Sequence, residues 1–421
     1  MKELENDILM CVKCGLCQSV CPVFQELGKE SSVARGKIAL VEALTEGSLE
    51  ITSTVSEWIE CCLLCGKCVE DCPSGVRVDL ILLRTRAIST ELKGLSFTKR
   101  LILRVFLKNP WLFHIGLKAA SVFQKMLFRP TGLDRIHKAR LSIGLDRRRN
   151  VLPLARKAVR ERWPEVISPE IFAGRVALFT GCITNSILTG IGDAAIRVLL
   201  KHNIETIIPK DQSCCGMIAM AMGDEATFTT LAKRNLKAFS SMKVDGIITT
   251  CATCGYTLKY LYSEFLRNES QDVRHMAKMV SDQTYDICEY IVNQLEAKKV
   301  THHEIHSPSN GIVVTCHDPC HLKRKQGIYH KQRKFIDLIE GITLKEMSTP
   351  DRCCGGGGSF SLSYYDLSLQ ILNKKVDDIE KTNADIVLTS CAGCHMQLVD
   401  GLAQRSSPIK VRHPIELYEE A

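Results

Sequence analysis

The spacing of its cysteines constrains this chain more than any other feature. The 421 residues contain 21 cysteines, of which residues 1–92 carry nine, 93–170 none, and 171–300 and 301–421 six each. The chain begins MKELENDILMC, without the apolar stretch of an export signal, so we expect a cytoplasmic protein whose thiols bind metal or catalyse reactions rather than form disulfides. The cysteine-free gap between Cys72 and Cys182 predicts a domain boundary.

Two runs near the N-terminus share the spacing C-x2-C-x2-C-x3-C-P. This is the two-cluster ferredoxin run, in which the fourth cysteine of each run serves the other cluster. It predicts one [4Fe–4S] cubane held by Cys11, Cys14, Cys17 and Cys72, and a second held by Cys62, Cys65, Cys68 and Cys21. Structural zinc is the alternative, but zinc sites use well-separated pairs of thiols. Cys61 does not fit the run and is expected to be a buried or spare thiol.

The second half of the chain contains an internal repeat. Each copy has a short apolar strand (175–182 or 311–320), a Cys-Cys-Gly motif, and a second strand (246–250 or 385–390) that ends in C-x2-C. Helical patterns at 194–203, 227–242 and 365–382 separate these landmarks. Strands that alternate with helices predict parallel α/β units, with functional groups at the carboxyl ends of the strands.

Five cysteines recur in each copy. Adjacent thiols suit neighbouring irons of one cluster better than tetrahedral zinc, and the glycine after each pair would let the backbone approach inorganic sulfur. We predict one or two further iron–sulfur clusters in these copies. In one alternative, only one copy holds a cluster and the other is degenerate or filled with zinc. In the other alternative, the cysteines serve purely as thiols or as zinc ligands. The candidate ligands are Cys182, Cys214, Cys215, Cys251 and Cys254, then Cys320, Cys353, Cys354, Cys391 and Cys394.

These motifs carry a family resemblance. The segments CVKCGLCQSVCP, CGKCVEDCPSGVRVD, the two Cys-Cys-Gly motifs, DPCHLKR (318–324) and VRHPIELYE (411–419) resemble the glycolate oxidase iron–sulfur subunit and its relatives in D-lactate and glycerol-3-phosphate dehydrogenase complexes. They are also similar to the catalytic subunit of heterodisulfide reductase. The resemblance implies an α-helical ferredoxin-like domain followed by two α/β CCG domains with short parallel sheets, and, from the reductase, noncubane [4Fe–4S] clusters held by those ten cysteines.

The function that this resemblance implies is electron transfer rather than autonomous catalysis. Electrons would pass from an FAD-containing partner that oxidises glycolate or D-lactate to an acceptor such as quinone. The alternative is a reductase that cleaves a disulfide at a CCG cluster, and a zinc-stabilised scaffold is a third interpretation. The sequence has no Walker A, Rossmann or nucleophile-elbow motif, so we expect no flavin in this chain and assign no catalytic residue.

The expected domains are 1–92 (two-cluster domain), 93–170 (basic amphipathic helical connector), 171–300 (first CCG domain) and 301–421 (second CCG domain). Between Lys93 and Arg162 there are 18 Lys and Arg against three acidic residues. Mixed with apolar residues, this composition suits a partner subunit or the inner face of a membrane; plain packing is the alternative. No span can cross a bilayer, and nucleic-acid binding is not expected.

Several residues near the motifs have two interpretations. Cys316 is either a core thiol or a substitute ligand, and Cys288 is expected in the core. The histidines that flank the cluster cysteines either contact sulfur or relay protons, or are ordinary loop and core residues. These histidines are His317, His321 and His395.

Overall fold

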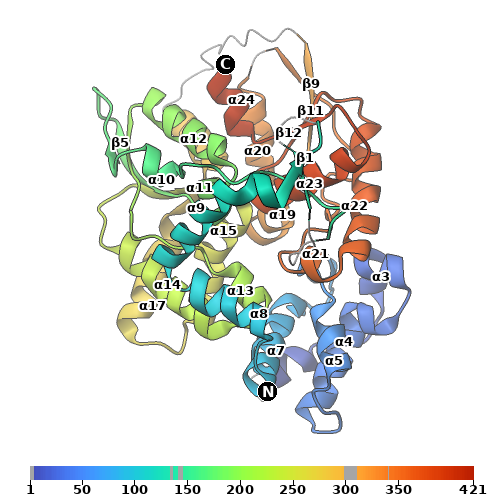
Figure 1. Cartoon of the computed structure of the whole chain (residues 1–421). Coiled ribbons are helices and arrows are strands. Elements are labelled where there is room, and N and C mark those ends of the chain that lie inside the picture. The colour runs from blue at the N-terminus through green and yellow to red at the C-terminus, as the bar shows by residue number, and fades with distance from the viewer. Residues whose placement is uncertain (1–3, 133–135, 141–145, 298–310, 340) are drawn as a thin grey trace.

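The N-terminal part of the chain is helical (Figure 1). The computed structural model describes residues 4–132, 136–140, 146–297, 311–339 and 341–421. Helix α4 (Ala34–Thr45) buries Ile38 and Val41, and Leu80–Leu83 of the long helix α7 (Val78–Lys93) are buried. The helices here are α1 (Glu5–Leu9), α2 (Leu16–Val20), α3 (Pro22–Leu27), the 3-10 turn η2 (Glu30–Ser32), α4 (Ala34–Thr45), α5 (Ser53–Glu60), α6 (Lys67–Glu70) and α7 (Val78–Lys93).

In the described part of the connecting segment the long helices end at Leu127, and only the short helix α10 (Val159–Arg162) lies beyond them. Helix α8 (Phe97–Arg100), the π-helix η3 (Leu101–Leu107) and α9 (Pro110–Leu127) are followed by three short antiparallel strands. The helical prediction is therefore wrong for its second half, because Pro130 disfavours helix at the preceding residue and Phe128 to Pro130 are extended. The later elements are β1 (Phe128–Pro130), β2 (His137–Ala139), β3 (Asn150–Val151), α10 (Val159–Arg162) and β4 (Val166–Ile167).

Each copy of the repeat forms a parallel sheet. The first sheet has the order β4-β6-β5-β7-β8, with only β4 antiparallel, and the second has the order β10-β9-β11-β12. The strands are β5 (Gly174–Phe179), β6 (Ile204–Ile207), β7 (Gly246–Thr249), β8 (Thr284–Asp286), β9 (Ile312–Cys316), β10 (Ile342–Leu344), β11 (Ile386–Leu388) and β12 (Lys410–Arg412). Apart from β4 the two orders are the same, so the repeat in sequence is a repeat in topology.

Helices connect and cover these strands, and three of them, α12, α14 and α22, lie where the periodicity predicts helix at 194–203, 227–242 and 365–382. In the first copy they are α11 (Cys182–Ser186), α12 (Thr189–Lys201), α13 (Met217–Ala221), α14 (Glu225–Ser240), α15 (Ala252–Tyr256), the π-helix η4 (Thr257–Leu261), α16 (Tyr262–Phe265), α17 (Gln271–Gln283) and α18 (Ile287–Ala297). In the second they are α19 (Cys320–Gln326), α20 (Tyr329–Ile336), α21 (Phe360–Ser363), α22 (Tyr365–Glu380), α23 (Ala392–Gln404) and α24 (Pro414–Glu420).

The two copies exchange their last helices. Helix α18 follows the first sheet but packs on α20 of the second copy. Helix α24 follows the second sheet but packs on α12 of the first (Figure 1). Polar contacts support the second exchange: Tyr418 hydrogen-bonds to His202 at 3.0 Å, and Arg197 pairs with Glu419 at 2.7 Å. This reciprocal packing joins the copies and brings their cysteine motifs together.

Within the part of the chain that the structure describes, no helix is long and apolar enough to cross a membrane.

Candidate iron–sulfur sites

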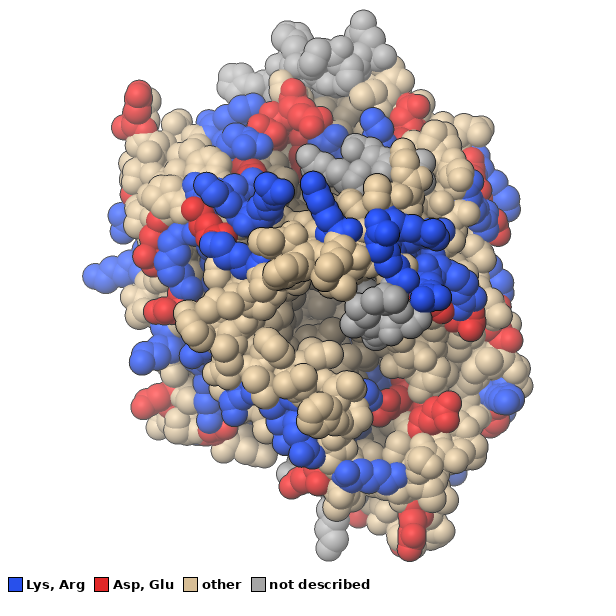
Figure 2. Space-filling view, in the orientation of Figure 1, with Lys and Arg blue, Asp and Glu red and all other residues tan. Residues whose placement is uncertain are grey.

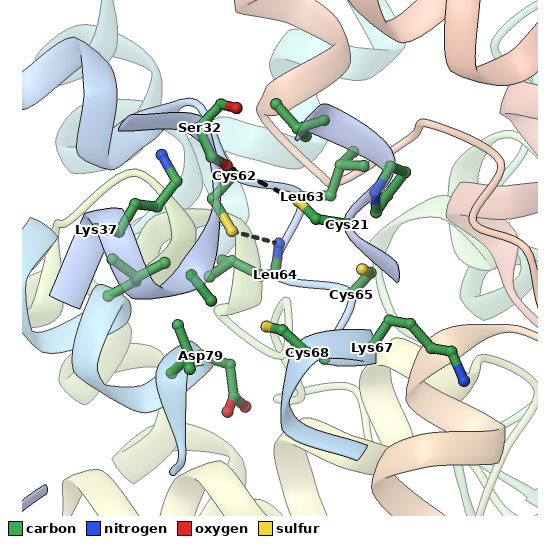
Figure 3. A pocket seen from close by; sticks show the side chains of 16 residues that line it. Cys21, Ser32, Lys37, Cys62, Leu63, Leu64, Cys65, Lys67, Cys68 and Asp79 are labelled. Atoms are coloured by element: carbon green, nitrogen blue, oxygen red, sulfur yellow. Dashed lines mark hydrogen bonds between the residues drawn. The ribbon is translucent and has the colours of Figure 1, made fainter. Parts of the chain in front are cut away.

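Four thiols from the two N-terminal runs line one cavity (Figure 3). Cys62, Cys65 and Cys68 come from the second run, and Cys21 reaches the same space from the end of the first run. Cys62 Sγ accepts a hydrogen bond from the Leu64 amide at 3.4 Å. The structure therefore gathers the four residues that the crossed ferredoxin pattern assigns to the second cubane.

Two buried cations lie beside this cavity. Lys37 is 1% exposed, and its ammonium donates to the Ser31 carbonyl at 3.0 Å and to the Trp58 carbonyl. Arg86 donates to the carbonyls of Ile59, Glu60 and Cys62 at 2.9 to 3.1 Å. It also donates to Ala221 of the first CCG copy at 2.9 Å, which links the cavity loop to that copy. Positive charge at this depth compensates several thiolates well.

Burial disfavours the thiolate form of these cysteines when no metal is bound. Desolvation raises the pKa of Cys21 to about 12 and raises the pKa of Cys68 well above its ordinary value. A metal that replaces the protons removes this penalty, so ligand formation releases protons at neutral pH.

The cysteines of the first run lie at the surface end of the domain. Cys14 is exposed, and the Arg35 guanidinium lies close to Cys14 and Cys17. Cys11 adds a like-charge contribution to the pKa of Cys17, which burial raises. The assignment of Cys72 to this set stays a prediction.

In the first CCG copy, the five predicted thiols form a connected group. Cys182, the first residue of α11, lies 3.7 Å from Cys214 Sγ. Cys215 hydrogen-bonds to Cys214 and Cys254, and these contacts lower its pKa well below the ordinary value. Cys254 also contacts Cys251, which caps α15 directly after strand β7.

The second copy repeats this arrangement. Cys354 hydrogen-bonds to Cys353 and Cys394, which lowers its pKa strongly, and Cys391 does the same with Cys251 and Cys394. Cys320, the first residue of α19, lies near Cys391 and Cys354, whose charges add to the effect of burial in raising its pKa. All ten predicted thiols therefore lie in two groups at the carboxyl ends of the central strands.

The glycines that follow the cysteine pairs serve packing. Gly216 and Gly355 have φ of +90° and +79°. A Cβ atom would lie 2.9 Å from a Phe228 ring carbon at the first and 2.6 Å from the Ser368 carbonyl oxygen at the second. A close approach of backbone to a cysteine thiol occurs at Gly181, where a Cβ would lie 3.1 Å from Cys254 Sγ. The expected approach of the backbone at Gly216 and Gly355 to inorganic sulfur stays a prediction.

Two thiol contacts join the groups to one another. A hydrogen bond with Cys353 lowers the pKa of Cys65 to about 6, so the N-terminal cavity touches the second CCG group. Cys251 and Cys391 hydrogen-bond across the boundary between the CCG groups. The thiols thus form a series that runs from the cavity through the second copy to the first.

A charged network surrounds the first of these contacts. The Arg324 side chain is 3% exposed and pairs with Asp351 at 2.9 Å and with Glu70 at 3.0 Å. The next residue, Lys325, pairs with buried Asp79. In the sequence Arg324 stood out only as part of a motif, and the roles of Lys37, Arg86 and Lys325 were missed. Only Lys325 had a signal in the sequence, because it directly follows the segment DPCHLKR (318–324).

Cys288 and Cys316 lie apart from the ten-thiol groups, whereas His317 lies beside one of them. Cys288 and Cys316 are buried near each other, away from the ten-thiol groups, as expected for core residues. His317 lies with Cys354 and Cys394 so that their donor atoms are within 4.8 Å of one another.

The other two histidines are also buried, and their surroundings lower the pKa of both to about 4, chiefly by desolvation. His321 contacts Thr253 Oγ1 at 3.0 Å, and that hydroxyl also reaches Cys391 Sγ at 3.4 Å. His395 lies in α23 directly after Cys394, and its Nδ1 has no hydrogen-bond partner.

The donor sets fit iron–sulfur clusters. Each is composed of sulfur, three of the four contain buried thiols, and buried cations or hydrogen bonds balance their charge. Clusters held in this way supply one-electron transfer, while the protein fixes their order and shields them from water.

Comparison with known proteins agrees with this interpretation. The description "4Fe-4S dicluster domain" matches residues 7–76, and "Cysteine-rich domain" matches residues 176–259 and 314–399, so the matches cover more than half of the chain. The chain belongs to this family of iron–sulfur subunits. In this chain a dicluster domain is joined to two cysteine-rich CCG domains.

Three curated relatives match almost the whole chain. The probable glycolate oxidase iron–sulfur subunit of Bacillus subtilis is 29% identical over 99% of this chain and 94% of its own length. The glycolate oxidase iron–sulfur subunit of Escherichia coli is 26% identical over 100% and 96%. A subunit of the fumarate reductase (CoM/CoB) of Methanothermobacter marburgensis is 28% identical over 98% and 72%.

Proposed function

We propose that this chain is the electron-transfer subunit of a flavin-linked 2-hydroxy acid dehydrogenase complex, with glycolate or D-lactate as the substrate class. The observation that carries the proposal is the unbroken series of thiols from the N-terminal cavity, through Cys65 and Cys353, to Cys391 and Cys251. Iron–sulfur clusters bound along this series would pass electrons from one to the next and would need no substrate pocket. The names of the two glycolate oxidase relatives supply the substrate class.

The finer assignments form part of this proposal. The N-terminal region is ferredoxin-like, with [4Fe–4S] cubanes held by Cys11, Cys14, Cys17 and Cys72 and by Cys62, Cys65, Cys68 and Cys21. Each CCG domain holds a further [4Fe–4S] cluster of noncubane type. An FAD-containing partner delivers the electrons, and a quinone accepts them. The domain limits at residues 92, 170 and 300 stay predictions.

The exposed position of Cys14 suggests where electrons enter. Its set lies at the surface end of the dicluster domain, whereas the other three sets contain buried thiols. Arg35, close to Cys14 and Cys17, places a positive charge beside this end of the series. An electron that enters at this end would move to the cluster in the N-terminal cavity and from there to the CCG clusters.

The test uses the complex purified without oxygen. We expect about 16 iron atoms per chain, about four for each cluster. Cys14→Ser should remove one cubane signal and stop electron flow to quinone, while the flavin partner still reduces an artificial dye. Cys61→Ala is the control, because Cys61 belongs to none of the four sets. Loss of dye reduction in an intact Cys14→Ser complex would contradict a purely conducting role, and zinc as the main metal would contradict the cofactor assignment.

A second function is disulfide reduction at a CCG cluster. The observation that favours it is that all ten thiols are present and form two groups that touch at Cys251 and Cys391. Direct binding of a thiol to iron would change the electron paramagnetic resonance (EPR) spectrum of the oxidised protein. An EPR titration with small thiols therefore separates the two functions, since a conducting cluster keeps its spectrum.

A further inference from the structure

Ten large apolar side chains are exposed on three consecutive helices of the connecting segment. In Figure 2 this face is an uncharged area over α8, η3 and α9, bordered by Lys and Arg. The ten, which we call the connector face, are Phe97, Leu101, Ile102, Val105, Phe106, Trp111, Ile115, Val122, Phe123 and Met126. Soluble surfaces rarely gather so many apolar groups without a binding partner.

One side of helix α9 packs against the protein, and the other side is exposed to solvent. Gln124 exchanges hydrogen bonds with the backbone of Leu154, at 3.1 and 2.9 Å, and Ser121 is buried. The outer side carries Trp111, Ile115 and Val122, with Met126 one turn further; Trp111 is 70% exposed and Met126 68%. Their spacings of four, seven and four residues place them in one stripe along the helix. The stripe is a continuous surface on an ordered element.

The charges that this segment itself carries have one sign. From Leu92 to Gly132 the chain has eight Lys and Arg and no acidic residue. Lys118 and Lys125 are seven residues apart and lie along one edge of the stripe. Glu161 pairs with Lys118, whereas Lys125 and Arg129 are exposed and make no ion pair within the described residues.

This charge pattern favours one kind of binding partner for the connector face over the others. A second copy would bring like charges together across a two-fold contact. The core of a protein interface is depleted in lysine, whereas lysines at the edge of an aromatic and aliphatic stripe are typical of helices that lie in the headgroup region of anionic membranes. We propose that the connector face binds an anionic lipid bilayer, with α9 lying in the plane of the interface. The proposal does not depend on the substrate of the complex.

The experiment measures sedimentation of the full-length holoprotein with vesicles, without oxygen and at about 0.1 M salt. Vesicles of phosphatidylcholine alone are compared with vesicles that also contain phosphatidylglycerol. We expect binding only to the anionic vesicles. Trp111→Ser/Phe123→Ser should lower the partition coefficient at least tenfold, and Lys125→Gln/Arg129→Gln about fivefold for each cation removed. All these residues are exposed, so the cluster absorption should not change.

Matched controls distinguish binding by the connector face from nonspecific adsorption to the vesicles. Ile171 and Phe172 are exposed to 69% and 61% outside the connector face, so Ile171→Ser/Phe172→Ser should bind as wild type. Arg274→Gln/Lys278→Gln removes two exposed cations from α17 and should do the same. Equal binding to neutral vesicles, or unchanged binding by both connector variants, would overturn the proposal. So would absence of vesicle binding combined with loss of the dehydrogenase partner from the Trp111→Ser/Phe123→Ser complex, which would identify a protein interface.

Discussion

Gly357, in the glycine run of the second CCG domain, lies directly against Leu63, in the loop that carries the cavity cysteines. A Cβ atom at Gly357 would come 2.7 Å from Leu63 Cδ2 and 3.2 Å from Leu63 Cα. This contact lies next to the hydrogen bond between Cys65 and Cys353, so it fixes the junction between the dicluster domain and the second CCG domain.

Gly357→Ala should therefore slow electron transfer across this junction. The neighbouring Gly358 is a matched control, because both glycines have positive φ (+52° and +60°) but a Cβ at Gly358 meets nothing within 4 Å. Both variants carry the same kind of backbone strain, about 1 kcal/mol, while only Gly357→Ala separates the two loops. Rapid freeze-quench EPR of the reduced complex would measure the transfer rate. Equal rates in the two variants would show that the contact is unimportant.

The buried ammonium of Lys37 should raise the reduction potential of the cluster in the neighbouring cavity. Reduction adds negative charge, and a cation in the low-dielectric interior stabilises that charge. Lys37→Met keeps the packing of the stem and should lower the midpoint potential by on the order of 50–100 mV, for a charge several ångström away at an effective dielectric constant of about 20. An EPR redox titration measures the potential.

Two further variants keep the Lys37 experiment interpretable. Lys37→Arg preserves the charge and should hold the potential near the wild-type value if the cavity accepts the larger group. Lys29→Met removes an exposed lysine from the preceding loop and should leave the potential unchanged. A Lys37→Met protein with an intact signal and the wild-type potential would contradict the electrostatic role.

Cys354 is the central thiol of its group, because it contacts both Cys353 and Cys394. Cys354→Ala should abolish the EPR signal of the second CCG cluster and leave the cubane signals in place. Cys316→Ala is the control, since Cys316 is fully buried outside the group. The nearest replacement donor is His317, so a shifted signal that disappears in Cys354→Ala/His317→Ala would reveal ligand substitution. An unchanged signal in both variants would mean that the ligand set is wrong.

Sequence patterns predicted the local parts of this molecule well. The strands that end near Cys182, Cys251 and Cys391 were predictable because short apolar runs between amphipathic helices specify parallel units. The crossing of Cys21 into the second run was predictable from spacing alone.

What the sequence did not show depends on contacts between distant segments. The exchange of α18 and α24 leaves no local signal, since each helix has the same apolar stripe whichever copy it packs on. Lys37 and Arg86 look like ordinary surface residues in sequence, because only the tertiary structure shows the carbonyls that surround them. Thiol contacts such as that of Cys65 with Cys353 arise from domain docking.

Asp286 links the exchanged helix α18 to pH. It ends strand β8, its Oδ1 accepts a hydrogen bond from the Cys288 amide at 2.9 Å, and its Oδ2 has no partner. Burial, with a smaller contribution from Glu289, raises the pKa of this carboxyl from 3.8 to about 7. The folded protein therefore holds a proton that the unfolded chain releases near pH 3.8.

The protonated carboxyl stabilises the fold fully below pH 3.8, and this contribution is lost as pH rises through 7. Between pH 6 and pH 8 the free energy of unfolding falls by about 1.4 kcal/mol. A fully bound proton would contribute about 1.4 kcal/mol per pH unit, and the folded carboxyl is on average half protonated over these two units. Asp286→Asn keeps the Oδ1 acceptor and removes the titration, so its stability relative to wild type should increase over this range. Hydrogen–deuterium exchange of α18 amides, compared between the proteins at matched pH, measures the difference. Asp272→Asn, an exposed carboxylate on α17, should follow wild type at every pH. If Asp286→Asn also follows wild type, Asp286 is ionised in the folded protein and α18 does not respond to pH through it.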